Sequence, residues 1–168
     1  MPDASHLAVF AVAALALELE TIALGPLVES CLRSVEAEAR ARNVRLERRL
    51  DDARARCAPE QVERVLLNLL ANALRHTPSD GTVAVSVAAI APDVRVSVED
   101  TGDGLEPETA RRMFDRFWRA DSARSTPGAG LGLAIARGLV EAQGGRIWAE
   151  PAESGGARVS FTLPAAIA

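Results

Sequence analysis

Three short segments carry residue types that can hold a nucleotide and a divalent cation. They are residues 68–72, with an asparagine at each end, the Asp-Thr-Gly-Asp-Gly segment 100–104, and the alternating glycines of 128–133. Mg²⁺ accepts amide oxygens as ligands, a buried carboxylate can accept a hydrogen bond from the amino group of adenine, and a glycine-rich turn before a helix can receive phosphate charge. Together they predict a pocket for a magnesium nucleotide.

The two asparagines are expected on one edge of a helix that starts at Pro59. Asn68, Asn72 and Arg75 recur at helical spacing, so they stack turn on turn, away from the apolar face. An amide oxygen on this edge is suited to bind Mg²⁺. On spacing alone, two asparagines on a solvated face would give the same pattern.

Asp100 is predicted to point into the protein. It continues the alternating series of Val94, Val96 and Val98, which is typical of one buried strand face. A buried carboxylate needs hydrogen-bond donors, and the adenine amino group is one. Gly102 and the following Gly104 leave room for a flat base, although an ordinary Asp-Gly turn after a strand would also fit.

The glycines Gly128, Gly130 and Gly132 precede a predicted helix, whose free amide groups can accept phosphate charge. Their spacing is not the G-x-G-x-x-G of a dinucleotide-binding turn. A flexible loop before a helix is the alternative.

Any side-chain cation that contacts phosphate must be a guanidinium, because all 19 basic residues are arginine. This excludes a P-loop lysine. Arg119 and Arg124 are the predicted phosphate clamps, in a Gly-, Ser- and Pro-rich segment expected to close over the nucleotide. Phe114, Phe117 and Trp118 are expected to pack at its hinge.

These residues need a scaffold of helices and strands in alternation. Apolar periodicity and Gly/Pro positions predict helices near 3–20, 27–43, 59–76, 107–118 and 131–143, with Gly25-Pro26 ending the first, and strands near 44–50, 83–87, 94–98, 146–150 and 157–163. We therefore predict an α+β fold, a two-layer α/β sandwich with a mixed sheet of about five strands and helices on one face.

The first predicted helix is apolar on two opposite sides, so it needs two neighbours. It could be an internal core helix, but we favour a helix that pairs with another chain. Its apolar run from Leu7 to Leu17 has 11 residues, whereas a bilayer needs about 20.

The composition favours one domain in the cytoplasm. The chain has 168 residues, a length typical of one domain. Its net charge of -4 lacks the excess of positive charge that is typical of nucleic-acid-binding proteins. It has two cysteines and lacks the basic start of a secretory signal. We expect no disulfide, no nucleic-acid partner and no membrane insertion by this chain.

Four motifs, in this order, resemble those of the catalytic ATP-binding domain of bacterial sensor histidine kinases, in the superfamily of gyrase, Hsp90, histidine kinases and MutL. NLLANALRHT at 68–77 resembles the N box, DTGDG at 100–104 the G1 box, MFDRFWR at 113–119 the F box and GAGLGL at 128–133 the G2 box. The resemblance covers about residues 27–164. It implies a Bergerat-type ATP-binding fold with ATP and Mg²⁺ as cofactors.

The resemblance also implies roles for single residues. Asn72 would bind the metal, Asn68 would lie beside a metal-bound water, and Asp100 would bind adenine. Arg75 and His76 would lie near phosphate. Together with Asn68 and Arg124 they are the predicted catalytic residues. The remaining implied nucleotide-binding positions are Gly102, Gly104, Arg119, Gly128, Gly130, Leu131 and Gly132.

Three positions inform the expected activity. Relatives that hydrolyse ATP or phosphorylate serine resemble one another in having glutamate where this chain has Asn68, and an asparagine cannot take a proton from water or serine. It suits transfer to a neutral imidazole. Trp118 replaces a usual tyrosine, and Ala157 stands where threonine is frequent, which implies a weaker adenine contact.

Histidine kinases resemble one another upstream as well, in a histidine box on a two-helix dimerisation hairpin. His6 is followed by Leu7 and Ala8 rather than by an acid, arginine and proline, so we do not expect it to accept phosphate. We predict residues 1–25 to be a remnant of the dimerisation region or a partner-binding helix, and residues 26–168 to be the catalytic domain.

The predicted function is a histidine kinase acting in trans. The chain would transfer the γ-phosphoryl group of ATP to a histidine on a separate dimerisation protein, which would pass it to a response regulator. The alternatives are a non-catalytic nucleotide-binding regulator that docks on or inhibits a complete kinase, and an ATPase or serine kinase of the same fold.

Overall fold

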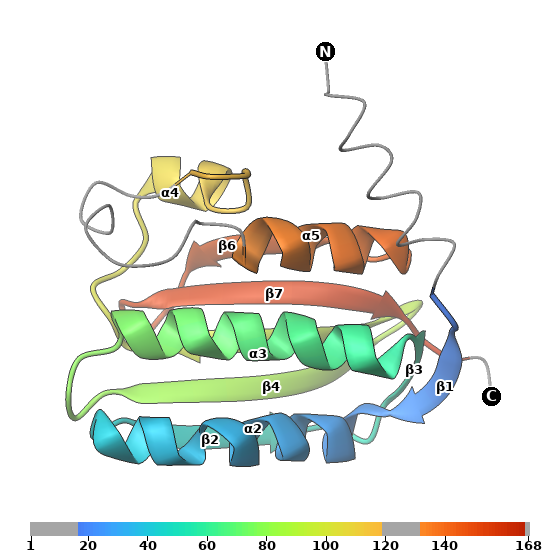
Figure 1. The fold of residues 1–168 in the computed structure, drawn as a ribbon, viewed down its shortest axis with the longest axis horizontal. Coiled ribbons are helices and arrows are strands. Elements are labelled where there is room, and N and C mark those ends of the chain that lie inside the picture. Colours follow the sequence, from blue (N-terminus) through green and yellow to red (C-terminus); the bar gives the residue numbers. More distant parts are fainter. Residues whose placement is uncertain (1–16, 119–131, 167–168) are drawn as a thin grey trace.

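The structure is a computed structural model that describes residues 17–118 and 132–166 (Figure 1). Helices α2, α3 and α5 cover one face of a five-stranded sheet, and a two-stranded sheet lies at one end. The elements are β1 (Glu20–Ala23), α2 (Leu24–Ala41), β2 (Arg45–Leu50), β3 (Arg54–Cys57), α3 (Pro59–His76), β4 (Thr82–Ile90), β5 (Asp93–Asp100), α4 (Pro107–Arg112), α5 (Gly132–Ala142), β6 (Ile147–Pro151) and β7 (Ala157–Pro164).

The sheet is mixed, in the order β2-β4-β5-β7-β6. β2 and β4 are parallel, whereas β4 with β5, β5 with β7 and β6 with β7 are antiparallel. This confirms the predicted α+β sandwich with helices on one face.

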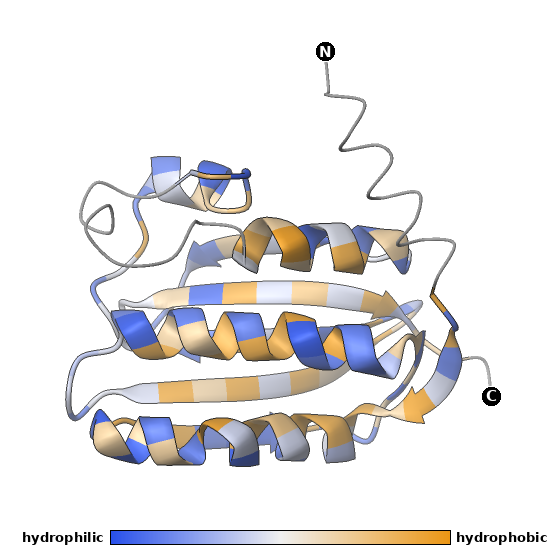
Figure 2. Ribbon diagram, viewed as in Figure 1, coloured by the Kyte–Doolittle hydropathy of each residue, from blue (hydrophilic) through white to orange (hydrophobic). Residues whose placement is uncertain are grey.

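The core forms where strand alternation meets the apolar stripe of α3. Val85 pairs with Val98 and Val87 with Val96, and all four side chains are buried. Leu66 and other apolar residues of α3 are buried against them. Figure 2 shows this alternation of hydrophobic and hydrophilic residues along strands and helices. Each element thus turns its apolar side to a shared interior.

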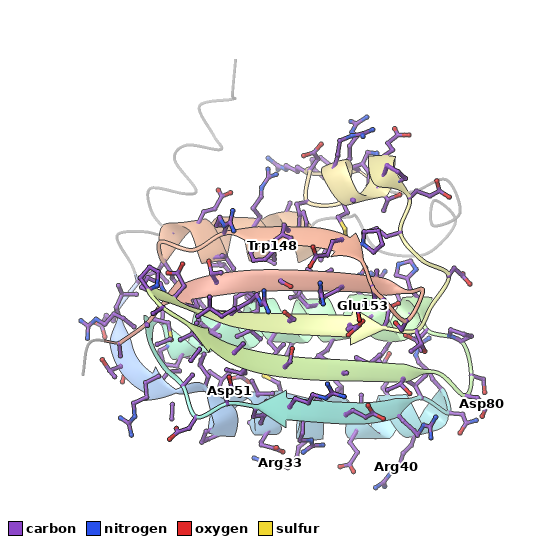
Figure 3. All side chains as sticks on the ribbon, turned by 180° about the vertical axis from the view of Figure 1, so that it is seen from behind. Arg33, Arg40, Asp51, Asp80, Trp148 and Glu153 are labelled. Carbon is purple, nitrogen blue, oxygen red and sulfur yellow. The ribbon has the colours of Figure 1, made fainter. Side chains whose placement is uncertain are left out.

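The opposite face of the sheet is covered by no helix of the described residues (Figure 3). Most of its strand positions carry polar or small side chains, and Ser97 and Ser160 join their hydroxyl groups there at 2.8 Å. Trp148 of β6, which pairs with Ser160, is a large aromatic exception on this face. The nucleotide-binding residues must therefore be sought on the helical side or at the sheet's ends.

The N-terminal prediction was wrong in two respects. The first helix was expected to reach about residue 20, but Glu20–Ala23 forms β1, which pairs antiparallel with β3, a strand that was not predicted. Gly25-Pro26 does not end a helix but lies in the first turn of α2, where proline needs no amide donor. Residues 1–16 lie outside the described part.

The helix predicted over 107–118 is shorter than expected. α4 ends at Arg112, and Phe117 adopts a left-handed backbone (φ 63°), which no helix continues through. Met113 and Phe114 are buried, whereas Phe117 is 59% exposed, so its predicted hinge packing was wrong.

Cys31 and Cys57 are free, buried thiols. Burial, helped by the nearby charge of Glu63, raises the pKa of Cys31 to about 12, and burial with Glu20 raises the pKa of Cys57 to about 11. Both thiols therefore remain protonated at neutral pH, as expected for structural cysteines.

Across residues 17–118 and 132–166, no helix combines the length and the apolar character that crossing a bilayer requires.

Candidate functional site

The predicted motifs converge where α3 ends, β5 ends and α5 begins. A Cβ atom on Gly102, just after β5, would collide with the main-chain carbonyl oxygen of His76, the last residue of α3. Asn68 of α3 donates from Nδ2 to the carbonyl oxygen of Gly132, the first residue of α5, at 3.1 Å. Tertiary folding thus brings the N box, the G1 box and the end of the G2 box together.

Asp100 is the most constrained polar residue of this site. It is buried, at 6% exposure, as its register with Val98 predicted. Its Oδ1 accepts hydrogen bonds from the backbone N–H groups of Gly102 at 2.9 Å and Ala157 at 3.2 Å. No donor in the described residues bonds its Oδ2, which is not sealed from solvent. One oxygen therefore fixes the carboxylate, and the other can accept a ligand donor.

Glycines let backbone segments approach Asp100 closely. At Gly156, a Cβ atom would collide with the carbonyl oxygen of Asp100 and lie 2.6 Å from its Oδ1. Gly104 has a φ of 96°, which suits glycine. No side chain could replace the hydrogen of Gly102 or Gly156 without moving the backbone.

Two participants were missed as site residues in the sequence. They are Gly156, just before Ala157, and Ser154, whose Oγ donates to the carbonyl oxygen of Asp100 at 3.3 Å. The Gly155-Gly156 pair before the last strand was the available signal.

The polar edge of α3 has the predicted residues in the predicted order. Asn68 and Asn72 are half-buried, and Arg75 and His76 are exposed at the end of the helix. Because Nδ2 of Asn68 faces the Gly132 carbonyl, this side chain acts as a donor to the protein and cannot serve as a base.

The predicted roles of five residues lie outside the described part of the chain. These residues are Arg119, Arg124, Gly128, Gly130 and Leu131. Gly132 is described, is exposed, and begins α5 as expected for the end of a glycine-rich turn.

The donor set fits a magnesium nucleotide. Within residues 17–118 and 132–166, His, Cys, Asp and Glu side chains form no group of three that could hold a metal ion. A metal here would rely on an amide oxygen and on oxygen atoms of the ligand, and Mg²⁺ binds nucleotide phosphates in this way. Asp100, framed by glycines, suits the amino edge of an adenine base.

Comparison with known proteins gives matches over most of the chain. Residues 57–167 match the family described as histidine kinase-, DNA gyrase B-, and HSP90-like ATPase. The sensor histidine kinase WalK of Bacillus subtilis is 40% identical over 109 residues, which is 62% of this chain and 18% of WalK. The chain covers 11–27% of the length of the curated relatives that it matches.

Two solved structures share the fold over nearly the whole chain. Full-length ShkA in complex with AMPPNP is 30% identical, with a TM-score of 0.84 over 97% of this chain and 34% of ShkA. The histidine kinase ThkA in complex with the response regulator TrrA is 26% identical, with a TM-score of 0.76 over 96% of this chain and 48% of ThkA.

Proposed function

Because the chain belongs to the family of histidine kinase-, DNA gyrase B- and HSP90-like ATPases, as the ATP-binding domain of a histidine kinase of a two-component system, we propose that it phosphorylates a histidine in trans. It binds Mg-ATP between α3, the end of β5 and the start of α5. It then transfers the γ-phosphoryl group to a histidine on a separate dimerisation protein, which passes it to a response regulator.

The observation that carries this proposal is the carboxylate of Asp100, whose Oδ1 is hydrogen-bonded to the protein and whose Oδ2 accepts no hydrogen bond from the described residues. Two backbone N–H groups hold Oδ1, so the side chain is fixed before any ligand binds. Oδ2 then accepts the 6-amino hydrogen of adenine, and the glycine backbones on either side admit the flat ring. Such preorganisation lowers the entropy cost of binding.

The phosphates extend from this position toward the start of α5, where free helix amides and the helix dipole favour negative charge. Asn72, with Asn68 one turn before it, faces them from α3, and Asn72 supplies the amide oxygen for Mg²⁺. When bound, Mg²⁺ neutralises phosphate charge as it is redistributed. Arg75 and His76, with Arg119 and Arg124, supply further positive or hydrogen-bonding groups near the phosphates.

Asn68 favours imidazole as the acceptor. A neutral imidazole nitrogen of the partner attacks the γ-phosphorus, the bond from that phosphorus to the β–γ bridging oxygen breaks, and ADP leaves. No proton must be removed before attack, so no base is needed where Asn68 lies. Catalysis is then mostly positioning and charge neutralisation.

The two parts of the chain have different proposed roles. Residues 26–168, together with β1 and the first residues of α2, form the catalytic domain, and the segment before β1 binds the partner that carries the histidine. WalK is named as a sensor histidine kinase, and ThkA is solved with a response regulator, which supports two-component partners of this kind.

The direct test incubates the chain with [γ-³²P]ATP and candidate histidine-box dimerisation proteins. We expect acid-labile label on the partner, none on a partner whose box histidine is replaced by alanine, and transfer onward when a response regulator is added. A chain that binds ATP but labels none of the partners would refute transfer in trans. If it also inhibited a complete kinase, the regulator alternative would replace it.

Asn72→Ala tests the metal ligand. We expect the affinity for Mg-ATP to fall about tenfold, toward the value measured in EDTA, because a carbon side chain cannot replace the amide oxygen. Calorimetry with and without Mg²⁺ measures this. Gln61→Ala, which removes an amide from the first turn of α3, should change nothing. An equal loss of affinity with and without the metal would contradict the assignment.

A further inference from the structure

Helix α5 is anchored unequally along its length. Its later residues Gly138, Leu139 and Val140 are buried, and the buried Gln143 just beyond it accepts a hydrogen bond from the Ala58 N–H at 2.7 Å. The first residue, Gly132, is exposed, and the next three are half-buried. Apolar packing therefore fixes the end of α5 more firmly than its beginning.

Polar contacts from two neighbouring segments hold the first turns of α5. From α3, Nδ2 of Asn68 donates to the Gly132 carbonyl at 3.1 Å. From the turn after α4, Oδ1 of Asp115 lies 3.6 Å from Nη1 of Arg137, in the second turn of α5. The start of α5 is thus held to α3 by an amide and to the α4 turn by an ion pair.

Asp115 also links this ion pair to α4. Its Oδ2 lies 3.5 Å from Nε of Arg112, at the end of that helix. The next two residues before it, Met113 and Phe114, are buried in the core. These buried neighbours in the chain, and not the exposed Arg112, hold Asp115 in place, so that it can act as a fixed point for Arg137.

We propose that Asp115 and Arg137 are positioning residues for the nucleotide. Their ion pair fixes the first turns of α5 relative to the α4 turn, and so places the helix amides that receive the phosphates. This inference rests on the proposed ATP site. Neither residue touches the nucleotide; each acts through the position of α5.

The exposure of this pair predicts where its effect appears. Asp115 and Arg137 are 43% and 41% exposed, and exposed pairs contribute little to global stability. Losing the pair should therefore leave thermal unfolding of the free protein nearly unchanged. The loss should appear in nucleotide affinity, because only a small displacement of the α5 amides is needed to weaken phosphate binding.

Asp115→Asn gives the sharpest test, because a through-space charge effect and a positioning role predict opposite changes in ATP affinity. Removing an anion near a site for ATP should strengthen ATP binding if charge acts only through space. Positioning predicts that binding weakens, by about threefold to fivefold. Arg137→Gln should weaken it similarly, and the double variant should bind no more weakly than either single variant, since both remove one ion pair.

Arg112→Gln is the matched control. Arg112 pairs with the same carboxylate and carries the same charge, but it lies on α4 and does not reach α5. Its loss should leave ATP affinity unchanged, whereas Arg137→Lys, which keeps the cation, should bind nearly as well as the parent. At about 1 M salt the parent and Arg137→Gln should converge, because screening removes the pair.

Calorimetric titration of the full chain and its variants with Mg-ATP measures all of these affinities. If Asp115→Asn strengthens binding, or if Arg112→Gln and Arg137→Gln act alike, the positioning role is wrong. If Asp115→Asn is neutral and Arg137→Gln weakens binding, Arg137 contacts the nucleotide directly and the role is also wrong. Failure of the parent to bind ATP would instead overturn the proposed function.

Discussion

Asp100→Asn is expected to weaken Mg-ATP binding about 100-fold while the domain stays folded. In the parent, Oδ1 accepts from the N–H groups of Gly102 and Ala157. The single carbonyl oxygen of asparagine can take over both hydrogen bonds. Its amino group then lies where Oδ2 was, and presents a donor to the adenine amino group, which is also a donor. Two buried donors are left unpaired, which is the costly outcome.

The same reasoning predicts a change of base preference. Inosine triphosphate carries a carbonyl oxygen at the position of the adenine amino group. The asparagine variant should therefore bind inosine triphosphate more tightly than ATP, whereas the parent should prefer ATP. Competition between the two nucleotides, followed by calorimetry, measures this reversal.

Asp93→Asn is the control for Asp100→Asn. It makes the same chemical change at the opposite end of β5, far along the strand from the site. It should leave both affinity and base preference unaltered. Should Asp100→Asn bind ATP as the parent does, with its thermal unfolding unchanged, the adenine site lies elsewhere.

Gly156→Ala is expected to damage both the fold and the site. The new Cβ would overlap the carbonyl oxygen of Asp100 and lie 2.7 Å from its carbonyl carbon. Backbone atoms cannot yield as a flexible side chain would, so the turn before β7 must move away from the end of β5. We expect a loss of about 3 kcal/mol in the free energy of unfolding. The melting temperature should fall by about 6–12 °C, and ATP binding should be lost.

The neighbouring glycine provides the comparison. A Cβ atom on Gly155 would meet nothing within 4 Å, although its φ of 95° disfavours alanine. Gly155→Ala should therefore cost only about 1 kcal/mol and retain most ATP binding. Differential scanning calorimetry and nucleotide titration separate the two variants. Equal effects from both would show that close approach to Asp100 is not what Gly156 provides.

Local pattern explains which elements were predicted well. The bounds of α3 follow from Pro59 at its start, a continuous apolar stripe, and Thr77-Pro78 after its end, all of which are local signals. The inward direction of Asp100 follows from the two-residue period of β5. Both are properties of a few neighbouring residues, and the side-chain period carries them without any information about the rest of the fold.

The errors occurred where distant partners decide the structure. β1 and β3 have only four residues each and are strands because they pair with one another. Phe117 was expected to be packed because it is apolar, but a left-handed backbone turns it outward. Periodicity cannot indicate either result, because short strands and turns draw their stability from contacts with other segments.

For the site, the sequence by itself determined the chemical groups: amides on one edge of α3, a carboxylate facing inward at the end of β5, and glycines where backbones must be bare. Only the tertiary structure decided how these groups are held. It supplied the Ala157 N–H to Asp100, the Gly132 carbonyl to Asn68, and Arg137 to Asp115. Side-chain type and local period are encoded residue by residue, whereas a hydrogen bond between segments far apart in the chain exists only after packing of the whole core has brought them within reach.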